Sequence, residues 1–328
     1  MSNKISIATV SAYSFHMVEQ PQQLNNFGVL ERFVTAAPRS RTGLPKSLTR
    51  NRLVFSGVRH YGGKIVPSLG HSLNWLVIRD FDLWAIKQLG LANIINSLSR
   101  FATNTLKFVS ERGLLTCCDR GSWHILEKKK VLDDEAQRLG INKTYFDPWI
   151  VDRELEDYET VDRIFEPSEP ALQSFIKRGV NPAKISKVPC GVDISRFKVP
   201  GGPRQRSSML SVGTVGMQKG HHLLVNAYRS LKSRSASLTF VGPIDPNFED
   251  ILDISRGDIR VTGALNRDGV VRELQNADMF VLASIQEGLA LVIVQTMACG
   301  LPIIATEATG VREQVDEFEK LHEEKKLS

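Results

Sequence analysis

The chain alternates short runs of β-branched and aliphatic residues with longer stretches that have the periodicity of amphipathic helices. In the first half, strands are expected near residues 5–10, 32–36, 53–57, 114–118, 163–167 and 185–189. Helical patterns cover residues 85–110, 127–140, 153–161 and 169–179. Two of them end on glycines, Gly140 and Gly179, which suit the position after a helix. This alternation is typical of parallel sheets joined by crossover helices.

A stretch without periodicity, VPGGPRQRS at residues 199–207, interrupts the alternation, and its prolines and glycines indicate a linker. Beyond it, strands are expected at 208–213, 237–242, 259–263, 279–284 and 301–306, and helices at 221–232, 248–254 and 269–277. The sequence therefore predicts an α/β chain with two Rossmann-like parallel-sheet domains, 1–198 and 208–328. Ligands of such sheets bind at the carboxyl ends of the strands, so we expect the active loops of both domains to point into a cleft between them.

The composition is that of a globular protein with room for two domains: 328 residues, 42% hydrophobic and 24% charged. No segment approaches the unbroken apolar run of ~20 residues that a membrane span requires, and the N-terminus MSNKISIATVSAY lacks the features of a signal peptide. The four cysteines, Cys117, Cys118, Cys190 and Cys299, have no metal-ligand spacing and suit a reducing compartment. We therefore expect a cytoplasmic protein.

The net charge is +6, from 42 basic and 36 acidic side chains. It fits anionic small molecules, a membrane surface or nucleic acid, and does not choose among them. The segment PRSRTGLPKSLTRNR at residues 38–52 holds five of the cations. It is either a solvated loop or a surface that meets phospholipid or a lipid-diphosphate acceptor, which would make the protein peripheral to the inner face of a membrane.

The loop SVGTVGMQKG at residues 211–220 joins an expected strand to an expected helix. Gly213, Gly216 and Gly220 allow the backbone to approach a ligand closely, and the helix start behind them offers free N–H groups to an anion. Lys219 lies at the mouth of this loop. The spacing is neither the dinucleotide fingerprint nor a P-loop, so an ordinary tight turn between strand and helix is the alternative.

The segment EGLALVIVQTMACG at residues 287–300 is almost entirely apolar but contains Glu287 and Gln295. We expect Glu287 near the start of a helix that runs to Ala298, in which eight residues advance ~12 Å. This is about the span from the sugar ring to the ribose of a nucleotide sugar. Both side chains accept hydrogen bonds from hydroxyl groups. The alternative is that Glu287 is a helix-start acid and that Gln295 faces solvent.

The stretch MFVLASIQEGLALVIVQTMACGLPIIAT, residues 279–306, resembles the C-terminal donor-site signature of the family 4 glycosyltransferases. Further motifs resemble the same family in order: Asp162 and Ser168 in 161–180, the Gly191-Val192-Asp193 run and Phe197 in 184–197, the loop 211–220, and TCCDRGSWH at 116–124. The resemblance covers most of the chain. It implies the GT-B fold, in which two Rossmann-like domains face each other, and the transfer of a sugar from a nucleotide sugar with retention of anomeric configuration.

The resemblance also implies roles for individual residues. Lys219 would pair with the donor diphosphate, Glu287 would touch the transferred sugar, and Gln295 would meet the ribose. His124 is a candidate for a side chain that faces the sugar, with a satisfied core or surface histidine as the alternative. The implied donor-binding residues are Gly213, Gly216, Lys219, Gly220, Gly288, Leu289 and Gln295.

By the same resemblance, we expect no metal and no cofactor apart from the donor, such as a UDP- or GDP-sugar. The acceptor would be a saccharide, a lipid-linked or a small molecule, as in cell-surface polysaccharide or glycoconjugate biosynthesis, and we expect no nucleic-acid partner. A nucleotide-sugar epimerase of the same architecture is a further alternative, although such enzymes lack this acid-rich helix signature.

Three features depart from the family pattern. Gln295 replaces the second glutamate of the signature, and Thr214 and Gln218 occupy the positions where relatives place an arginine. Relatives also continue with several helices where this chain ends in the charged stretch EKLHEEKKLS, residues 319–328. We therefore expect a partner or an oligomer to cover the shortened C-terminal domain. The departures keep open a shortened, weakly active or inactive relative that serves as a binding or partner subunit.

Overall fold

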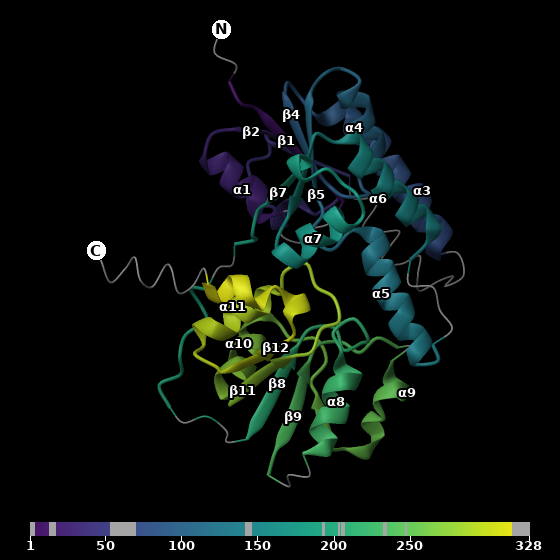
Figure 1. Ribbon diagram of the computed structural model, residues 1–328. Helices are drawn as coiled ribbons and strands as arrows, with labels where there is room; N and C mark the ends of the chain where they lie inside the picture. The colour runs from purple at the N-terminus through teal and green to yellow at the C-terminus, as the bar shows by residue number, and fades with distance from the viewer. Residues whose placement is uncertain are drawn as a thin grey trace. The chain divides into compact units, whose positions relative to one another are not determined.

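The alternation of strands and helices builds two parallel sheets in the computed structural model (Figure 1). The structure describes residues 4–12, 18–52, 70–141, 146–191, 194–202, 204, 207–231, 235–246 and 248–316, without the side chains of residues 70–74 and 255. The chain divides into two compact units. The first comprises residues 1–120, 146–166 and 180–186, and the second comprises 121–145, 167–179 and 187–328. The boundaries predicted at the linker 199–207 stay a prediction.

The sheet of the first unit has seven strands in the order β3-β2-β1-β4-β5-β6-β7. Their bounds are β1 Ile7–Ser11, β2 Leu30–Thr35, β3 Thr49–Asn51, β4 Ile94–Leu98, β5 Leu115–Asp119, β6 Arg163–Glu166 and β7 Ile185–Lys187. Among the described residues of this unit, the α-helices are α1 Glu19–Asn26, α3 Gly70–Ala85, α4 Thr103–Ser110 and α6 Pro148–Thr160. Asp147 begins α6 by accepting a hydrogen bond from the amide of Trp149, with Pro148 at the first helical position.

The sheet of the second unit has five strands in the order β10-β9-β8-β11-β12. Their bounds are β8 Ser208–Val212, β9 Ser237–Val241, β10 Ile259–Val261, β11 Met279–Leu282 and β12 Ile303–Ala305. Its helices are α5 Ile125–Arg138, α7 Glu169–Lys177, α8 His221–Ser230, α9 Glu249–Leu252, α10 Arg267–Asn276 and α11 Leu291–Ala298. Apolar side chains from β8, α10, β11 and α11 pack into one core, each at most 1% exposed: Leu210, Leu274, Phe280 and Ile293. Their burial holds β8 and β11 in place.

Most predicted strands and helices are confirmed to within a few residues. The helices predicted to end at Gly140 and Gly179 end two residues earlier, at Arg138 and Lys177, and both glycines follow the cap residue with left-handed φ angles, +71° and +82°. The continuous helical pattern predicted for 85–110 is wrong, because β4 lies inside it. Gly90, with φ +69°, ends the preceding helical turn, and the polar Asn96 and Ser97 inside β4 obscured the strand. The strand predicted at 53–57 and the tail 319–328 lie outside the described residues.

Candidate functional site

The strand order of the second sheet defines where its loops meet. From β8 the chain proceeds to β9 and β10 on one side of the sheet, and then crosses to β11 and β12 on the other. The topological switch point therefore lies between β8 and β11, which pair in parallel through Met279 with Met209 and Phe280 with Leu210. In open parallel sheets, ligands bind beside the carboxyl ends of the strands at this point. The two loops that follow, residues 213–220 and 283–290, contain the charged residues of the candidate site.

The loop 213–220 is held close to its neighbours by glycine. Gly220 has φ +64° and a Cβ built on it would lie 1.9 Å from the carbonyl oxygen of Ala283, so no larger residue fits without a shift of the backbone. The amide of Gly213 donates to the carbonyl of Val241 on β9. Gly220 directly precedes α8, and the amides of His221 and Leu223 at the start of this helix donate to the carbonyls of Gly216 and Gly220. The loop thus has the close backbone approach that an anion-binding turn needs.

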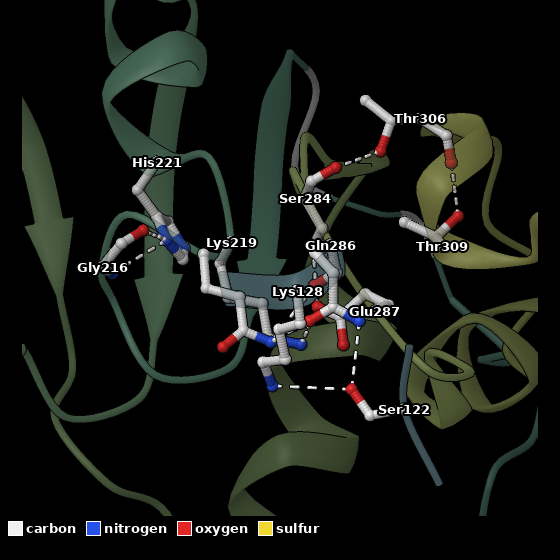
Figure 2. Close-up of polar contacts among 11 residues, drawn as sticks. Ser122, Lys128, Gly216, Lys219, His221, Ser284, Gln286, Glu287, Thr306 and Thr309 are labelled. Atoms are coloured by element: carbon white, nitrogen blue, oxygen red, sulfur yellow. Dashed lines mark hydrogen bonds and ion pairs between the residues drawn. The ribbon is translucent and has the colours of Figure 1, made fainter. Parts of the chain in front are cut away.

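His221 fixes the shape of the same loop. Its side chain is 1% exposed, packs edge-on against Phe240 at 4.6 Å between ring centroids, and places Nδ1 3.2 Å from both the amide nitrogen and the carbonyl oxygen of Gly216 (Figure 2). Burial is the main reason that the pKa of His221 falls to about 4. The imidazole is therefore neutral at physiological pH, and its hydrogen bond to the backbone of Gly216 fixes the conformation of the loop.

The two loops meet through a charged pair. Nζ of Lys219 lies 2.5 Å from Oε1 of Glu287, and the hydroxyl of Ser284 donates to the same carboxylate oxygen at 2.8 Å. Side-chain exposures of 22% for Lys219 and 10% for Glu287 leave the pair partly accessible to solvent. The structure therefore brings together the two residues that the sequence assigns to the diphosphate and to the sugar.

The loop 283–290 is anchored by hydrogen bonds to the segment after β12. The amides of Glu287 and Ala290 donate to the carbonyls of Ala308 and Thr309. The hydroxyl of Thr306 donates to the carbonyl of Ser284 at 2.6 Å (Figure 2). These contacts fix the backbone on both sides of Glu287, so its carboxylate is held in position from both ends of the loop.

A polar chain leads from the loop 213–220 to residues 121–124. The side-chain Nε2 of Gln218 donates to the backbone carbonyl and to the side-chain Oε1 of Gln286, each at 3.2 Å. Gln286 is fully buried, and its own Nε2 donates to Oγ of Ser122 at 3.1 Å. Nζ of Lys128 lies 3.5 Å from the same hydroxyl (Figure 2). A Cβ built on Gly288 would lie 2.0 Å from the carbonyl oxygen of Gly121, so these backbones are in direct contact. This contact brings α5 next to the site.

His124 caps the helix that carries Lys128. Its Nδ1 accepts a hydrogen bond from the amide of Leu126 at 3.2 Å, its own amide donates to Oγ of Ser174, and its ring packs edge-on against Phe175. With 4% exposure, the side chain has the features of a satisfied structural histidine. A role for His124 at the sugar stays a prediction.

The helix predicted to begin near Glu287 begins later. α11 starts at Leu291, and Glu287 belongs to the preceding loop. The spacing of ~12 Å along one helix axis therefore does not describe how Glu287 and Gln295 are separated. Gln295 lies on α11 and is half-buried, as is Leu289 in the loop. The amide and hydroxyl partners Ser284, Gln286 and Ser122 were missed, because no single sequence motif marks a residue whose role is to support another.

The geometry and the comparisons identify the class of protein first. WaaG, a solved glycosyltransferase involved in lipopolysaccharide biosynthesis, superposes with a TM-score of 0.59 and 13% identity over 95% of this chain and 84% of that chain. HepE of Anabaena, solved with UDP and glucose, superposes with a TM-score of 0.61 and 13% identity over 94% of this chain and 82% of that chain. With its two parallel sheets, the chain has the GT-B glycosyltransferase fold.

The sequence comparisons show similarity to glycosyltransferases in the second half of the chain. Residues 206–324 match the family model described as "Glycosyl transferases group 1". The predicted resemblance to a glycosyltransferase family is thus confirmed for residues 206–324, about a third of the chain. The amylovoran biosynthesis glycosyltransferase AmsK of Erwinia amylovora is 26% identical over 188 residues, 51% of this chain and 46% of that protein. The matches span less than half the length of the curated relatives. Within the described residues, no helix combines the length and apolarity needed to cross a membrane.

Proposed function

We propose that this protein transfers a hexose from a nucleotide sugar to an acceptor hydroxyl with retention of anomeric configuration. The observation that carries the proposal is the pair of Lys219 and Glu287, whose Nζ and Oε1 lie 2.5 Å apart at the switch point of the second sheet. A UDP-sugar is the first donor to test, because HepE was solved with UDP and glucose. Names of relatives such as AmsK favour an acceptor in polysaccharide biosynthesis.

The proposed roles follow from charge. During transfer, the bond between the anomeric carbon and the diphosphate oxygen breaks and a bond from the anomeric carbon to the acceptor oxygen forms. Negative charge grows on the departing diphosphate, which takes up the proton that the acceptor hydroxyl loses. Lys219, at the end of the glycine loop, would stabilise that charge by exchanging its contact with Glu287 for one with the diphosphate oxygens. Glu287, oriented by Ser284, would accept hydrogen bonds from hydroxyls of the sugar. Gly288 and Leu289 would line the donor, and Gln295 would meet the ribose as a neutral amide.

Calorimetry with UDP, GDP and their hexose derivatives tests the proposal. Lys219→Ala should weaken binding of diphosphates about tenfold or more, since a charged hydrogen bond contributes roughly 1.5–3 kcal/mol. Glu287→Ala should weaken binding of the nucleotide sugar more than binding of the free nucleotide. Arg196→Ala is the matched control, because its pair with Asp268 is exposed on the same unit. If the wild type bound no nucleotide, or if both variants bound like the control, the proposal would be wrong.

A second function rests on Gln295 and on the loop residues Thr214 and Gln218. With an amide and two uncharged residues where relatives have an acid and an arginine, the chain could bind a nucleotide sugar or a partner protein without efficient transfer. Nucleotide binding without detectable hydrolysis or transfer across a panel of saccharide acceptors would favour this alternative.

We further propose that the basic segment 38–52 is a contact for anionic lipid at the cytoplasmic face of a membrane. Its cations Arg39, Arg41 and Lys46 are exposed, whereas Arg52 pairs with Asp80 at 2.9 Å. Cosedimentation with phosphatidylglycerol vesicles should fall when these three exposed cations are replaced by alanine. Equal sedimentation of wild type and variant would make these three cations ordinary solvated side chains.

A further inference from the structure

The loop 213–220 provides less positive charge than a diphosphate requires. Each phosphate of a nucleoside diphosphate carries negative charge, but Lys219 is the only cation within the loop 213–220. Its ammonium group is already within 2.5 Å of the Glu287 carboxylate. At the two positions where the family resemblance implies an arginine, this chain has Thr214 and Gln218. A second cation from elsewhere in the unit would complete the site.

Lys128 on α5 is placed to be that cation. Its Nζ lies 3.5 Å from Oγ of Ser122, and this hydroxyl accepts from Nε2 of Gln286 at 3.1 Å. Gln286 directly precedes Glu287, and its Oε1 accepts a hydrogen bond from the side-chain Nε2 of Gln218, the neighbour of Lys219. Lys128 therefore reaches both loops of the candidate site through two side chains (Figure 2).

The helix that carries Lys128 is held in place by contacts within the second unit. The amide of Lys128 donates to the carbonyl of His124, so Lys128 lies in the first turn of α5. One position earlier, Glu127 pairs with Arg178 at 2.7 Å, which ties this turn to the end of α7. The close approach of Gly121 to Gly288 fixes the segment that leads into the helix. The backbone that carries Lys128 is thus held in place on both sides, by the contact at Gly121 and by the ion pair of Glu127.

We propose that Lys128 is a binding residue for the donor diphosphate, and that it supplies from α5 the positive charge that the loop 213–220 lacks. This inference rests on the proposed function, since it assigns a further residue to the same donor site. Ser122 and Gln286 act as positioning residues, because they hold Lys128 beside the loop that carries Glu287.

The test compares Lys128→Met with Lys130→Met in the full chain. Methionine keeps the length of the side chain and removes the charge. Lys130 is two positions along the same helix, 59% exposed and paired with Asp134 at 2.6 Å, so it is a matched control. Calorimetry with UDP or GDP, whichever the wild type binds, should show affinity lowered about tenfold for Lys128→Met. Uridine or guanosine should bind both variants like the wild type, because a nucleoside has no phosphate.

Two further results complete the test. Lys128→Arg should regain most of the affinity, because arginine keeps the charge, and thermal unfolding should show that Lys128→Met is folded. Normal diphosphate binding by Lys128→Met, or equal losses for diphosphate and nucleoside, would overturn the role of Lys128 and leave the proposed function intact. A wild type that binds no nucleotide would overturn both.

Discussion

The first five strands of each sheet have the same order, but the charged residues at the carboxyl ends of the strands differ in their exposure to solvent. In the first unit, Arg120 follows β5 and lies 2.9 Å from Glu154 on α6, whose carboxylate is fully buried and also accepts from Tyr158. Glu166 ends β6 with no exposure, and burial raises its pKa well above the ordinary range. In the second unit, the pair of Lys219 and Glu287 keeps 22% and 10% side-chain exposure.

The difference separates charges that stabilise the fold from charges that are available to a ligand. A buried pair has already exchanged water for protein partners, so removing one partner leaves the other without compensation. A partly exposed pair beside glycine loops can exchange partners when an anion arrives. The first network is therefore expected to support stability and the second to support binding, and three experiments test this difference.

The largest expected effect follows from removing Glu154. Glu154→Ala should lower the free energy of unfolding by about 3–5 kcal/mol, because Arg120 remains buried without its nearest carboxylate. Glu287→Ala should change it by no more than about 1 kcal/mol, since its pair is partly solvated. Urea unfolding of both variants measures the difference. Equal losses of stability would mean that the two pairs do not differ in kind.

An intermediate effect follows from two glycines of the second unit with similar backbone angles. Gly220 and Gly257 have φ of +64° and +69°, but only at Gly220 does an added Cβ meet backbone, 1.9 Å from the carbonyl oxygen of Ala283. Gly257→Ala should lower the free energy of unfolding by about 1–2 kcal/mol. Gly220→Ala should lower it by about 2–4 kcal/mol and should also weaken nucleotide binding. Nucleotide binding unchanged in Gly220→Ala would show that the loop geometry is not needed.

The smallest expected effect, taken per pH unit, is a pH dependence of opposite sign in the two units. Burial raises the pKa of Asp157 in α6 from 3.8 to about 7, whereas it lowers the pKa of His221 from 6.5 to about 4. Between pH 4 and 7 the folded state holds more protons at Asp157, so this residue makes the protein less stable as pH rises. Between pH 6.5 and 4 the unfolded state holds more protons at His221, so this residue makes it less stable as pH falls.

Unfolding of Asp157→Asn and His221→Gln from pH 4.5 to 7.5 measures both contributions. Relative to the wild type, Asp157→Asn should gain stability as pH rises, and His221→Gln should gain stability as pH falls. Each slope should be at most about 1.4 kcal/mol per pH unit, the value for one proton. Parallel curves for the wild type and both variants would contradict the contrast between the two units.

The fold could be predicted from sequence where local preference and burial agree. Strands such as β8 and β9 are apolar runs bounded by polar or glycine turns, and Gly140 and Gly179 marked the ends of α5 and α7. β4 was missed because Asn96 and Ser97 are polar but buried, on opposite faces of the strand, so its pattern matched no simple period. There the tertiary environment decides the strand, and a local pattern cannot show it.

The site could be predicted only where its residues belong to compact motifs. Lys219 and Glu287 each lie in a recognisable loop, and the strand order brings those loops together. Ser122 and Lys128 lie about 160 residues before Gln286 in the chain, so their spacing in the sequence could not predict that they meet at this site. The start of the helix after Glu287 was also placed too early, because an apolar run does not distinguish a buried loop from a helix.

The contact of Ser122 with Gln286 also gives the second unit an optical reporter. Trp123 follows Ser122 directly and is the only one of the four tryptophans in this unit, since Trp75, Trp84 and Trp149 belong to the first. With those three replaced by phenylalanine, the emission of Trp123 would follow events at the donor loops during titration. Stopped-flow fluorescence could then time the arrival and departure of a nucleotide on one indole, without a label.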